Sequence, residues 1–332
     1  MFLEQIQKYN PDLLSIALQF HQSGKIPPSC FIVDLDTVAE NTQTLVNAAH
    51  ENGLSLYFIT KQVGFNPVFA KEVCKNGIEK AVAVDWNEAL GLLSNEIPLG
   101  HLGHLVQIPT CMIAKMLHAS PEVITIFSVE KARQLSQVAK EEGLQANILL
   151  RVVDEEDFTY SGQTGGIPLT ALQSNLDTLS ALPNIKIAGV TAFPCTVFDP
   201  SKNQYVPTQN LMTIHKAAEI VAKRYAGEKL QINAPGNSCV QTFPLISRYG
   251  ATHAEPGNAL TGTTPLHAIL RQPEKPALIH VTEISHEYKN IYYCYGGGLY
   301  RRSTVTRALV GSNATALREA RVISPDKTSI DY

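Results

Sequence analysis

The sequence of 332 residues lacks the features typical of disulfide-rich, nucleic-acid-binding, membrane and secreted proteins. Its six cysteines form no CxxC pair and no Cys/His spacing of a zinc site, and the chain is long enough to fold without disulfides. It has no run of like charges, and 27 basic against 30 acidic residues leave a net charge of −3, which argues against nucleic-acid or membrane-surface partners. No apolar run approaches the ~18 residues of a membrane span, and the chain start lacks the basic and apolar regions of a secretory signal. We therefore expect a cytoplasmic protein with reduced thiols that acts on a small molecule.

Short runs of strand-forming residues alternate with helical stretches through the middle of the chain. Successive runs begin 18 to 43 residues apart, close to the length of one strand–helix unit, with or without an inserted loop. Eight units favour an α/β fold with a closed (β/α)8 TIM-like barrel, and an open doubly wound sheet is the alternative because spacing alone does not show closure. The predicted strands are 56–60, 80–84, 105–108, 123–127, 147–153, 187–193, 230–234 and 252–256.

Several predicted helices carry start signals. Asn66 precedes a proline, and Ser128 precedes an amphipathic pattern, so each is expected to cap a helix of the barrel. A further helix lies before the first barrel strand, with Asp36 or Thr37 as its expected N-cap and Glu40 placed to close a capping box.

The pattern changes after the last barrel unit. The segments ALIHVTEI, NIYYCYGG and REARVISP indicate strands of a smaller C-terminal β domain, which we expect to be incomplete because the region is short. The predicted domains are an N-terminal helical extension (1–30), the barrel with its preceding strand and helix (31–267), and the partial C-terminal β domain (268–332).

A lysine and two glycine-containing loops fall at the predicted carboxyl ends of barrel strands. Lys61 directly follows the run 56–60, so its amine is expected at the barrel mouth, where active sites of such barrels lie. The segments GNS (236–238) and EPGNALTGTT (255–264) follow the last two strands, where barrels often bind phosphate through backbone amides. Each feature alone also fits a solvated lysine or an ordinary turn. Together they predict a site for a phosphate-bearing cofactor.

Four segments resemble, in their order along the chain, the fold-type III enzymes that carry pyridoxal 5′-phosphate, the group of alanine racemase and the basic-amino-acid decarboxylases. They are VDLDTVAEN, TKQVGFNP, APGNS and AEPGNALTGT. Two further phrases resemble the YhfX-type predicted racemases of the alanine-racemase-like proteins, namely EPGNALTGTTPLH and YCYGGGLYRRS. The resemblance covers about residues 30–267 and extends into the last region. It implies a pyridoxal 5′-phosphate cofactor, an alanine racemase N-terminal domain, an amino-acid substrate and a homodimer.

The resemblance also implies the roles of individual residues. Lys61 would form the Schiff base with the cofactor and then act as a base at Cα of the external aldimine. Asn237 and Ser238 would lie at the cofactor phosphate, and the loop 257–264 would complete that site. The implied cofactor-binding residues are Lys61, Arg151, Phe193, Asn237, Ser238, Glu255, Gly257, Asn258, Thr261, Gly262 and Thr263.

Some of these positions depart from the family pattern. Glu255 stands where alanine racemases have an arginine at the pyridine nitrogen, whereas the decarboxylases have a glutamate that keeps this nitrogen protonated. Phe193 replaces a histidine that stacks on the ring, and Asn258 replaces an arginine that binds phosphate in the decarboxylases. Arg151 is expected at the cofactor's phenolic oxygen or the substrate carboxylate, or else in an ion pair with Asp154, Glu155 or Asp157.

Racemisation requires a second acid/base on the face of Cα opposite Lys61. In this fold it comes from the C-terminal region, where Cys294 and Tyr295 are the leading candidates. Cys294 comes first because its Cys-Tyr-Gly-Gly-Gly segment resembles a turn near the decarboxylase active site and a thiol exchanges protons near neutral pH. Tyr293, Tyr300 and His286 are the other candidates.

The leading hypothesis is therefore a pyridoxal-phosphate-dependent amino-acid racemase that acts through Lys61 and Glu255. The alternatives are a decarboxylase or lyase of the same fold, favoured by Glu255 and Cys294, and a carrier of the cofactor without turnover. No metal site is expected, because His101 and His104 have no cysteine or carboxylate near them in the sequence, which favours ordinary polar or capping roles.

Overall fold

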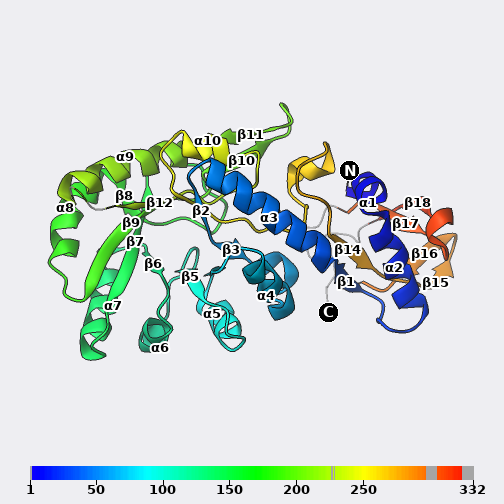
Figure 1. Ribbon diagram of the computed structural model, residues 1–332, viewed down its shortest axis with the longest axis horizontal. Coiled ribbons are helices and arrows are strands. Elements are labelled where there is room, and N and C mark those ends of the chain that lie inside the picture. Colours follow the sequence, from blue (N-terminus) through cyan, green and yellow to red (C-terminus); the bar gives the residue numbers. More distant parts are fainter. Residues whose placement is uncertain (1, 226, 228, 297–304, 324–332) are drawn as a thin grey trace. The chain divides into compact units, whose positions relative to one another are not determined.

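The computed structural model describes residues 2–225, 227, 229–296 and 305–323. The chain forms two compact units (Figure 1). One is the barrel unit, residues 39–260, and the other is the terminal unit, residues 1–38 together with 261–332.

The barrel unit contains a parallel sheet that closes on itself. Its hydrogen-bonded order is β2-β13-β12-β9-β7-β6-β5-β4-β3. β2, the first strand in this order, and β3, the last, are consecutive parts of one stretch of chain, two residues apart. The sheet therefore returns to its own beginning and closes. The strands are β2 (Ser55–Leu56), β3 (Phe58–Ile59), β4 (Ala81–Ala83), β5 (Leu99–Leu102), β6 (Val123–Ile126), β7 (Ala146–Val153), β9 (Ile185–Thr191), β12 (Gln231–Asn233) and β13 (His253–Ala254). The predicted α/β barrel is confirmed.

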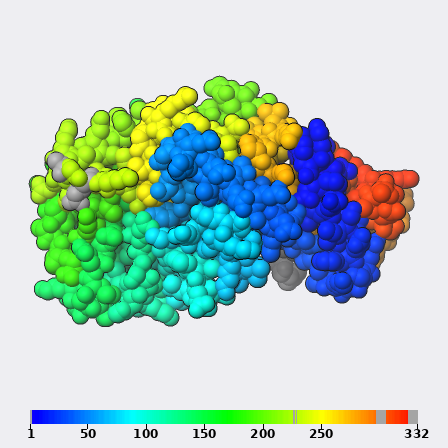
Figure 2. Space-filling view, viewed as in Figure 1, coloured from blue at the N-terminus to red at the C-terminus, as the bar shows by residue number. Residues whose placement is uncertain are grey.

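Helices surround these strands (Figure 1). The predicted caps at Asn66 and Ser128 are confirmed, because their side chains accept hydrogen bonds from the first-turn amides of α4 and α7. The C-terminal end of α3 lies against α10 (Figure 2), where Ser247 Oγ donates to the carbonyl oxygen of Asn52 at 2.7 Å. The helices are α3 (Leu35–Glu51), α4 (Pro67–Lys75), α5 (Trp86–Leu93), α6 (Ile113–His118), α7 (Val129–Glu141), α8 (Leu169–Ser180), α9 (Gln209–Arg224) and α10 (Phe243–Ser247).

The barrel interior is filled mainly by apolar side chains. Tyr57, Val82, Val123 and Leu149 form one buried cluster contributed by neighbouring strands. Burial of both strand faces explains why the predicted strands appear in the sequence as short continuous apolar runs. None of the helices in the described part of the chain is long and apolar enough to cross a membrane.

The third barrel strand is not where the sequence pattern predicts it. The strand β5 is Leu99–Leu102, whereas 105–108 belongs to the loop that follows Gly103, whose φ is +80°. The pattern is misleading because the sequence of β5, Leu-Gly-His-Leu, has low strand propensity. All four of its residues are nevertheless buried. Burial in the barrel therefore outweighs intrinsic propensity at this position.

The predicted N-cap of α3 is also wrong. The helix begins at Leu35, and Asp34 caps it by accepting a hydrogen bond from Thr37 N at 3.1 Å. The Thr37 hydroxyl also donates to Asp34, at 2.6 Å, so Thr37 lies inside the first turn and is not the cap. Asp34 and Asp36 are equally suited to capping by residue type, and the sequence pattern favours the wrong one.

Among its described residues, the terminal unit combines two α-helices with three short antiparallel strand pairs. The strand predicted to precede the barrel, β1 (Cys30–Val33), pairs antiparallel with β14 (Leu278–Val281) and so belongs to this unit. Asn10, the N-cap of α2, ties the region together by donating to Asp34 at 2.8 Å and to the carbonyl oxygen of Pro276 at 3.0 Å. The remaining elements are α1 (Phe2–Tyr9), α2 (Pro11–Gln22), β15 (Ile284–Tyr288), β16 (Ile291–Cys294), β17 (Arg307–Val310) and β18 (Arg318–Arg321).

Candidate active site

The carboxyl ends of the parallel barrel strands bring most of the predicted site residues to one mouth. Lys61 begins the short 3-10 turn Lys61–Val63 that follows β3, and its side chain is exposed. Phe193 follows β9, Asn237 follows β12, and Glu255 directly follows β13. Four of the predicted residues therefore follow strand ends on the same side of the barrel.

Glu255 lies at the centre of a buried hydrogen-bonded cluster. Its side chain is 1% exposed, and Oε1 is 2.8 Å from Asn233 Nδ2 and 2.5 Å from His101 Nδ1. The other ring nitrogen of His101 is 2.5 Å from Thr125 Oγ1. These partners come from three different strands, β12, β5 and β6. The cluster is thus assembled by the barrel and not by any local segment.

Three buried polar atoms in or beside this cluster have no hydrogen-bond partner. They are Asn233 Oδ1, Glu255 Oε2 and His104 Nδ1, and the last two are 3.6 Å apart. The ring of His104 meets Phe193 edge to face, with centroids 5.0 Å apart. An imidazole therefore stands next to Phe193, although it comes from the loop after β5 and not from the strand that carries Phe193.

The ionisation of the two residues follows from their surroundings. Burial alone would raise the pKa of Glu255, but the facing imidazole of His101 and the hydrogen bonds to Oε1 hold it down at about 2. Burial lowers the pKa of His104 to about 3, and the positive charge of Lys61 is among the smaller contributions in the same direction. Near neutral pH, Glu255 is a carboxylate and His104 is uncharged.

Arg151 is buried and holds two loops at the mouth. Its guanidinium donates to the carbonyl oxygens of Gly165 at 2.9 Å, Gln163 at 3.0 Å and His104 at 3.3 Å. It also lies over the ring of Phe127, 4.8 Å from the centroid. Within the described residues it forms no ion pair with the carboxylates of the loop that follows β7, so that alternative expectation is wrong. The guanidinium of Arg151 is bound by backbone carbonyl oxygens of the loops and not by carboxylates.

The GNS turn packs tightly against the hairpin of β10 (Thr196–Asp199) and β11 (Gln204–Pro207). A Cβ on Gly236 would lie 2.7 Å from Thr196 Oγ1, so only glycine fits there without a shift. Asn237 N donates to the same hydroxyl at 3.1 Å, and Ser238 Oγ accepts from Glu255 N at 3.1 Å. The turn is thereby connected both to the hairpin and to the backbone of Glu255.

The second predicted phosphate loop crosses the boundary between the units. In the barrel unit, Asn258 is exposed, and a Cβ on Gly257 would lie 3.3 Å from Ile59 Cβ. In the terminal unit, the hydroxyls of Thr261 and Thr263 are 2.8 Å apart. Gly262 has a φ of +60°, and a Cβ there would lie 2.1 Å from the carbonyl oxygen of Lys275, so glycine is needed for packing against that segment.

The candidates for the second acid/base lie on the hairpin of β15 and β16 in the terminal unit. Cys294 ends β16 and is exposed, and Tyr295 follows it with 47% of its surface exposed. Tyr293 stacks on His286, with centroids 4.7 Å apart. Tyr300 lies outside the described residues. The four described candidates thus belong to the terminal unit, whereas Lys61 and Glu255 belong to the barrel unit.

Sequence reasoning missed the histidines, Thr125 and Asn233. The expectation of ordinary polar or capping roles is wrong for His101, which is fully buried against Glu255, a residue 154 positions away. The i, i+3 spacing of His101 and His104 was the available signal. With Glu255, they offer three ligand atoms within 4.8 Å of one another, a group of the kind that holds metal ions.

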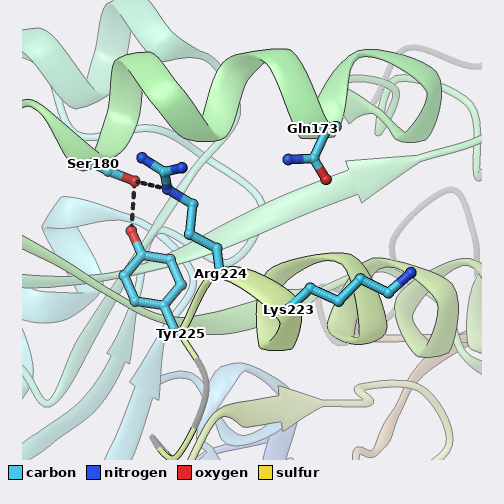
Figure 3. Close-up of a pocket in the computed structure, with 5 residues that line it drawn as sticks. All are labelled: Gln173, Ser180, Lys223, Arg224 and Tyr225. Carbon is cyan, nitrogen blue, oxygen red and sulfur yellow. Dashed lines mark hydrogen bonds between the residues drawn. The ribbon is translucent and has the colours of Figure 1, made fainter.

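A surface cleft on the outside of the barrel is a different feature (Figure 3). It is lined by residues of α8 and α9, where Ser180 Oγ lies 2.7 Å from the Tyr225 hydroxyl and accepts from Arg224 Nε at 3.1 Å. These hydrogen bonds join the ends of the two helices. The cleft offers no buried charge, and we assign it no chemistry. Its lining residues are Gln173, Ser180, Lys223, Arg224 and Tyr225.

Comparison with known proteins agrees with this architecture. The family model "Alanine racemase, N-terminal domain" matches residues 33–265, and the model "YhfX-like, C-terminal domain" matches residues 279–332. The chain therefore belongs to the alanine racemase N-terminal domain family, whose solved neighbours are fold-type III pyridoxal-phosphate enzymes.

Within that family, the chain is 40% identical over 334 residues to "Uncharacterized protein YhfX" of Escherichia coli (strain K12), covering 100% of this chain and 86% of that protein. The alanine racemase from Corynebacterium glutamicum matches with a TM-score of 0.61 at 17% identity, over 78% of this chain and 70% of that chain. The diaminopimelate decarboxylase from Helicobacter pylori matches with a TM-score of 0.61 at 13% identity, over 82% of this chain and 71% of that chain. The predicted family is confirmed, and the fold is shared by enzymes that catalyse different reactions.

Proposed function

We propose that this protein is a pyridoxal-phosphate-dependent amino-acid racemase. The observation that carries the cofactor assignment in this proposal is the buried carboxylate of Glu255, whose Oε2 has no hydrogen-bond partner at the mouth where Lys61 stands. A buried carboxylate oxygen without a partner is costly unless a bound group supplies a donor. A protonated pyridine nitrogen is such a donor, so the residues fit the cofactor.

The remaining residues of the mouth fit other parts of the cofactor. When bound, pyridoxal 5′-phosphate supplies an aldehyde that reacts with amines and a ring that withdraws electrons from the α-carbon. Lys61 offers the exposed amine for that aldehyde, and Phe193 with His104 offers an aromatic wall for the ring. Arg151 fixes the two loops beside the ring. The groups proposed to hold the phosphate are Asn237, Ser238, Gly257, Asn258, Thr261, Gly262 and Thr263.

Racemisation also requires that a proton leave Cα on one face and return on the other. We assign removal on one face to Lys61 Nζ and return on the opposite face to Cys294, with Tyr295 as the second candidate. Both candidates are exposed, which suits residues that act on a site outside their own hairpin. A homodimer in which the hairpin of one protomer completes the mouth of its partner would bring them to substrate. The six free cysteines support a reducing compartment, the cytoplasm.

A decarboxylase or lyase is the second candidate, and Glu255 is the observation that favours it. The carboxylate at this position resembles the EPG motif of the decarboxylases, and an enzyme of that class shares the fold. The racemase and the decarboxylase differ in the bond to Cα that breaks: the bond to hydrogen or the bond to the carboxylate carbon.

The cofactor proposal is tested by adding pyridoxal 5′-phosphate to the purified protein, reducing with borohydride and mapping the modified peptide. We expect a visible absorption band before reduction and a cofactor-labelled Lys61 after it. Lys61→Ala should abolish both signals, and Lys71→Ala, at an exposed lysine of α4, should leave them unchanged. Absence of a band in the folded wild type would overturn the assignment.

The reaction type is tested by incubating the loaded protein with single amino acids in D2O. Deuterium at Cα together with loss of optical activity identifies a racemase. The loss of optical activity should disappear in Cys294→Ala or Tyr295→Phe, according to which residue returns the proton, whereas exchange through Lys61 still introduces deuterium. Release of carbon dioxide and an amine identifies a decarboxylase. Binding of the cofactor without either product would leave a carrier as the function.

A further inference from the structure

We propose that Thr125 and His101 position Glu255, with the Thr125 hydroxyl holding His101 in the form that carries its proton on Nδ1 and donates it to Oε1. This arrangement leaves Oε2 of Glu255 free for a cationic N–H donor. The inference rests on the proposed function only for the identity of that donor, which is the ring nitrogen of the cofactor. His101 and Thr125 are positioning residues, because they act through Glu255.

The geometry supports a directed chain of hydrogen bonds. Thr125 Oγ1 is 2.5 Å from His101 Nε2, and His101 Nδ1 is 2.5 Å from Glu255 Oε1. All three side chains are at most 1% exposed, so water does not compete for these atoms. They stand on β6, on β5 and directly after β13, three separate segments that only the closed barrel brings together.

The direction of each bond follows from what each atom can do. Oε1 of Glu255 accepts a hydrogen bond from Asn233 Nδ2 at 2.8 Å, and a carboxylate oxygen only accepts. His101 Nδ1 must therefore carry a proton. In a neutral imidazole Nε2 is then an acceptor, so the Thr125 hydroxyl donates to it. Removing that hydroxyl would leave the Nε2 lone pair of His101 buried without a donor and would loosen the ring that donates to Oε1.

Asn233 completes the arrangement. Its Nδ2 donates to the same Oε1 at 2.8 Å, so two donors converge on one carboxylate oxygen and none on the other. A carboxylate held in this way has a defined rotation, with Oε2 presented to one direction. Preorganised groups of this kind lose little on binding a ligand, because their orientation is already set.

A metal ion is the competing explanation for the cluster of His101, His104 and Glu255. Two ligands of a tetrahedral zinc ion lie about 3.4 Å apart, given metal–ligand distances near 2.1 Å. The distance between His101 Nδ1 and Glu255 Oε1 is 2.5 Å, which is too short for two ligands of one ion and places the two atoms in direct hydrogen-bond contact. The geometry therefore points to positioning through hydrogen bonds.

The first experiment uses the full-length protein without cofactor and with 15N-labelled histidine. Long-range 1H–15N spectra distinguish the two neutral forms and the imidazolium, and assignment uses His101→Asn. We expect the Nδ1–H form of His101 in the wild type and in Thr125→Ser, which keeps the hydroxyl. Thr125→Val should shift the Nε2 resonance of His101 toward that of an imidazole nitrogen that accepts no hydrogen bond. An Nε2–H form or an imidazolium in the wild type, or no change in Thr125→Val, would overturn the proposal.

The second experiment measures the affinity for pyridoxal 5′-phosphate and the absorption spectrum of the bound form. Thr125→Val should weaken binding about tenfold and alter the pH dependence of the spectrum, while Thr125→Ser stays within about threefold of the wild type. His101→Asn, which can place an amide N–H near the position of Nδ1, should restore more affinity than His101→Ala. Equal affinity and equal spectra in Thr125→Val and the wild type would contradict the positioning role.

Two controls separate this inference from the proposed function. His118→Ala changes an exposed histidine that pairs with Glu142 and should affect neither measurement. If the wild type fails to bind the cofactor, the proposed function fails, and the spectra of the unloaded protein alone decide the role of Thr125 and His101. Tight binding of Zn2+ with loss of the Nδ1–H signal would show a metal site and overturn the inference.

Discussion

The carboxylate of Glu88 accepts a hydrogen bond from the hydroxyl of Thr60 at 3.0 Å, directly before Lys61 in the chain. Its second oxygen accepts from Val84 N at 2.8 Å, so the carboxylate joins the end of β4 to the turn that carries the lysine. Burial raises the pKa of Glu88 to about 7, and the positive charge of Lys61 is one of the smaller opposing contributions. A buried acidic side chain is thus hydrogen-bonded to the residue that precedes Lys61, the proposed cofactor lysine.

This arrangement predicts an unusual dependence of stability on pH. The folded protein binds the Glu88 proton more tightly than the unfolded chain, whose pKa is near 4.5, so the wild type loses stability as pH rises from about 4.5 through about 7. Glu88→Gln removes this loss, and its amide can still accept from Val84 N and donate to Thr60. The variant should gain roughly 1–3 kcal/mol relative to wild type between about pH 5 and pH 8 in urea unfolding. The exposed Glu130→Gln is the control, and parallel pH profiles for Glu88→Gln and the wild type would contradict the prediction.

Gly189 of β9 is predicted to tolerate no side chain. A Cβ there would lie 1.8 Å from the carbonyl oxygen of Gln231 in the neighbouring strand β12. Because backbone must move to relieve this contact, we expect Gly189→Ala to lower the free energy of unfolding by about 3 kcal/mol or more. Gly91→Ala is the matched control, since Gly91 lies in α5 with open space around its Cα, and it should raise stability by up to about 1 kcal/mol. Equal unfolding midpoints for the two variants would show that the barrel adapts at Gly189.

Arg151→Lys should be destabilising although the charge is kept. A lysine ammonium cannot reproduce the planar donor geometry that serves three loop carbonyls, so at least one buried carbonyl loses its partner. We expect a loss of about 2–4 kcal/mol in urea unfolding. Arg133→Lys, at an exposed position of α7, should change stability by less than about 0.5 kcal/mol. A loss below about 1 kcal/mol for Arg151→Lys would mean that the loops are held by other contacts.

The GNS turn provides a test of the proposed phosphate site. Gly236→Ala would press its Cβ against Thr196 and displace the hydroxyl that accepts from Asn237 N. We expect the affinity for pyridoxal 5′-phosphate to fall at least about tenfold, measured by quenching of protein fluorescence. Gly91→Ala again serves as the control for a glycine in open space. Unchanged affinity in a folded Gly236→Ala variant would place the phosphate elsewhere.

Much of the barrel can be predicted from local sequence patterns. Seven of the eight predicted strands coincide with observed ones, and the helix caps at Asn66 and Ser128 lie where the sequence places them. These features depend on side chains and backbone groups only a few residues apart, so composition and spacing suffice. The sequence pattern predicts β5 at the wrong residues, because β5 is a strand through burial among its neighbouring strands and not through the strand propensity of its own residues.

Local sequence patterns are enough to predict the spacing of strands and helices, the position of Lys61 after the first barrel strand and the order of the glycine-containing turns. The contacts of His101 and Thr125 with the Glu255 cluster arise from the folded barrel alone. Their contacts join residues 154 and 24 positions apart, and such contacts exist only when the strands lie in this order with this register. A hydrogen bond acts over about 3 Å. The chain must therefore close into a barrel before these side chains can meet.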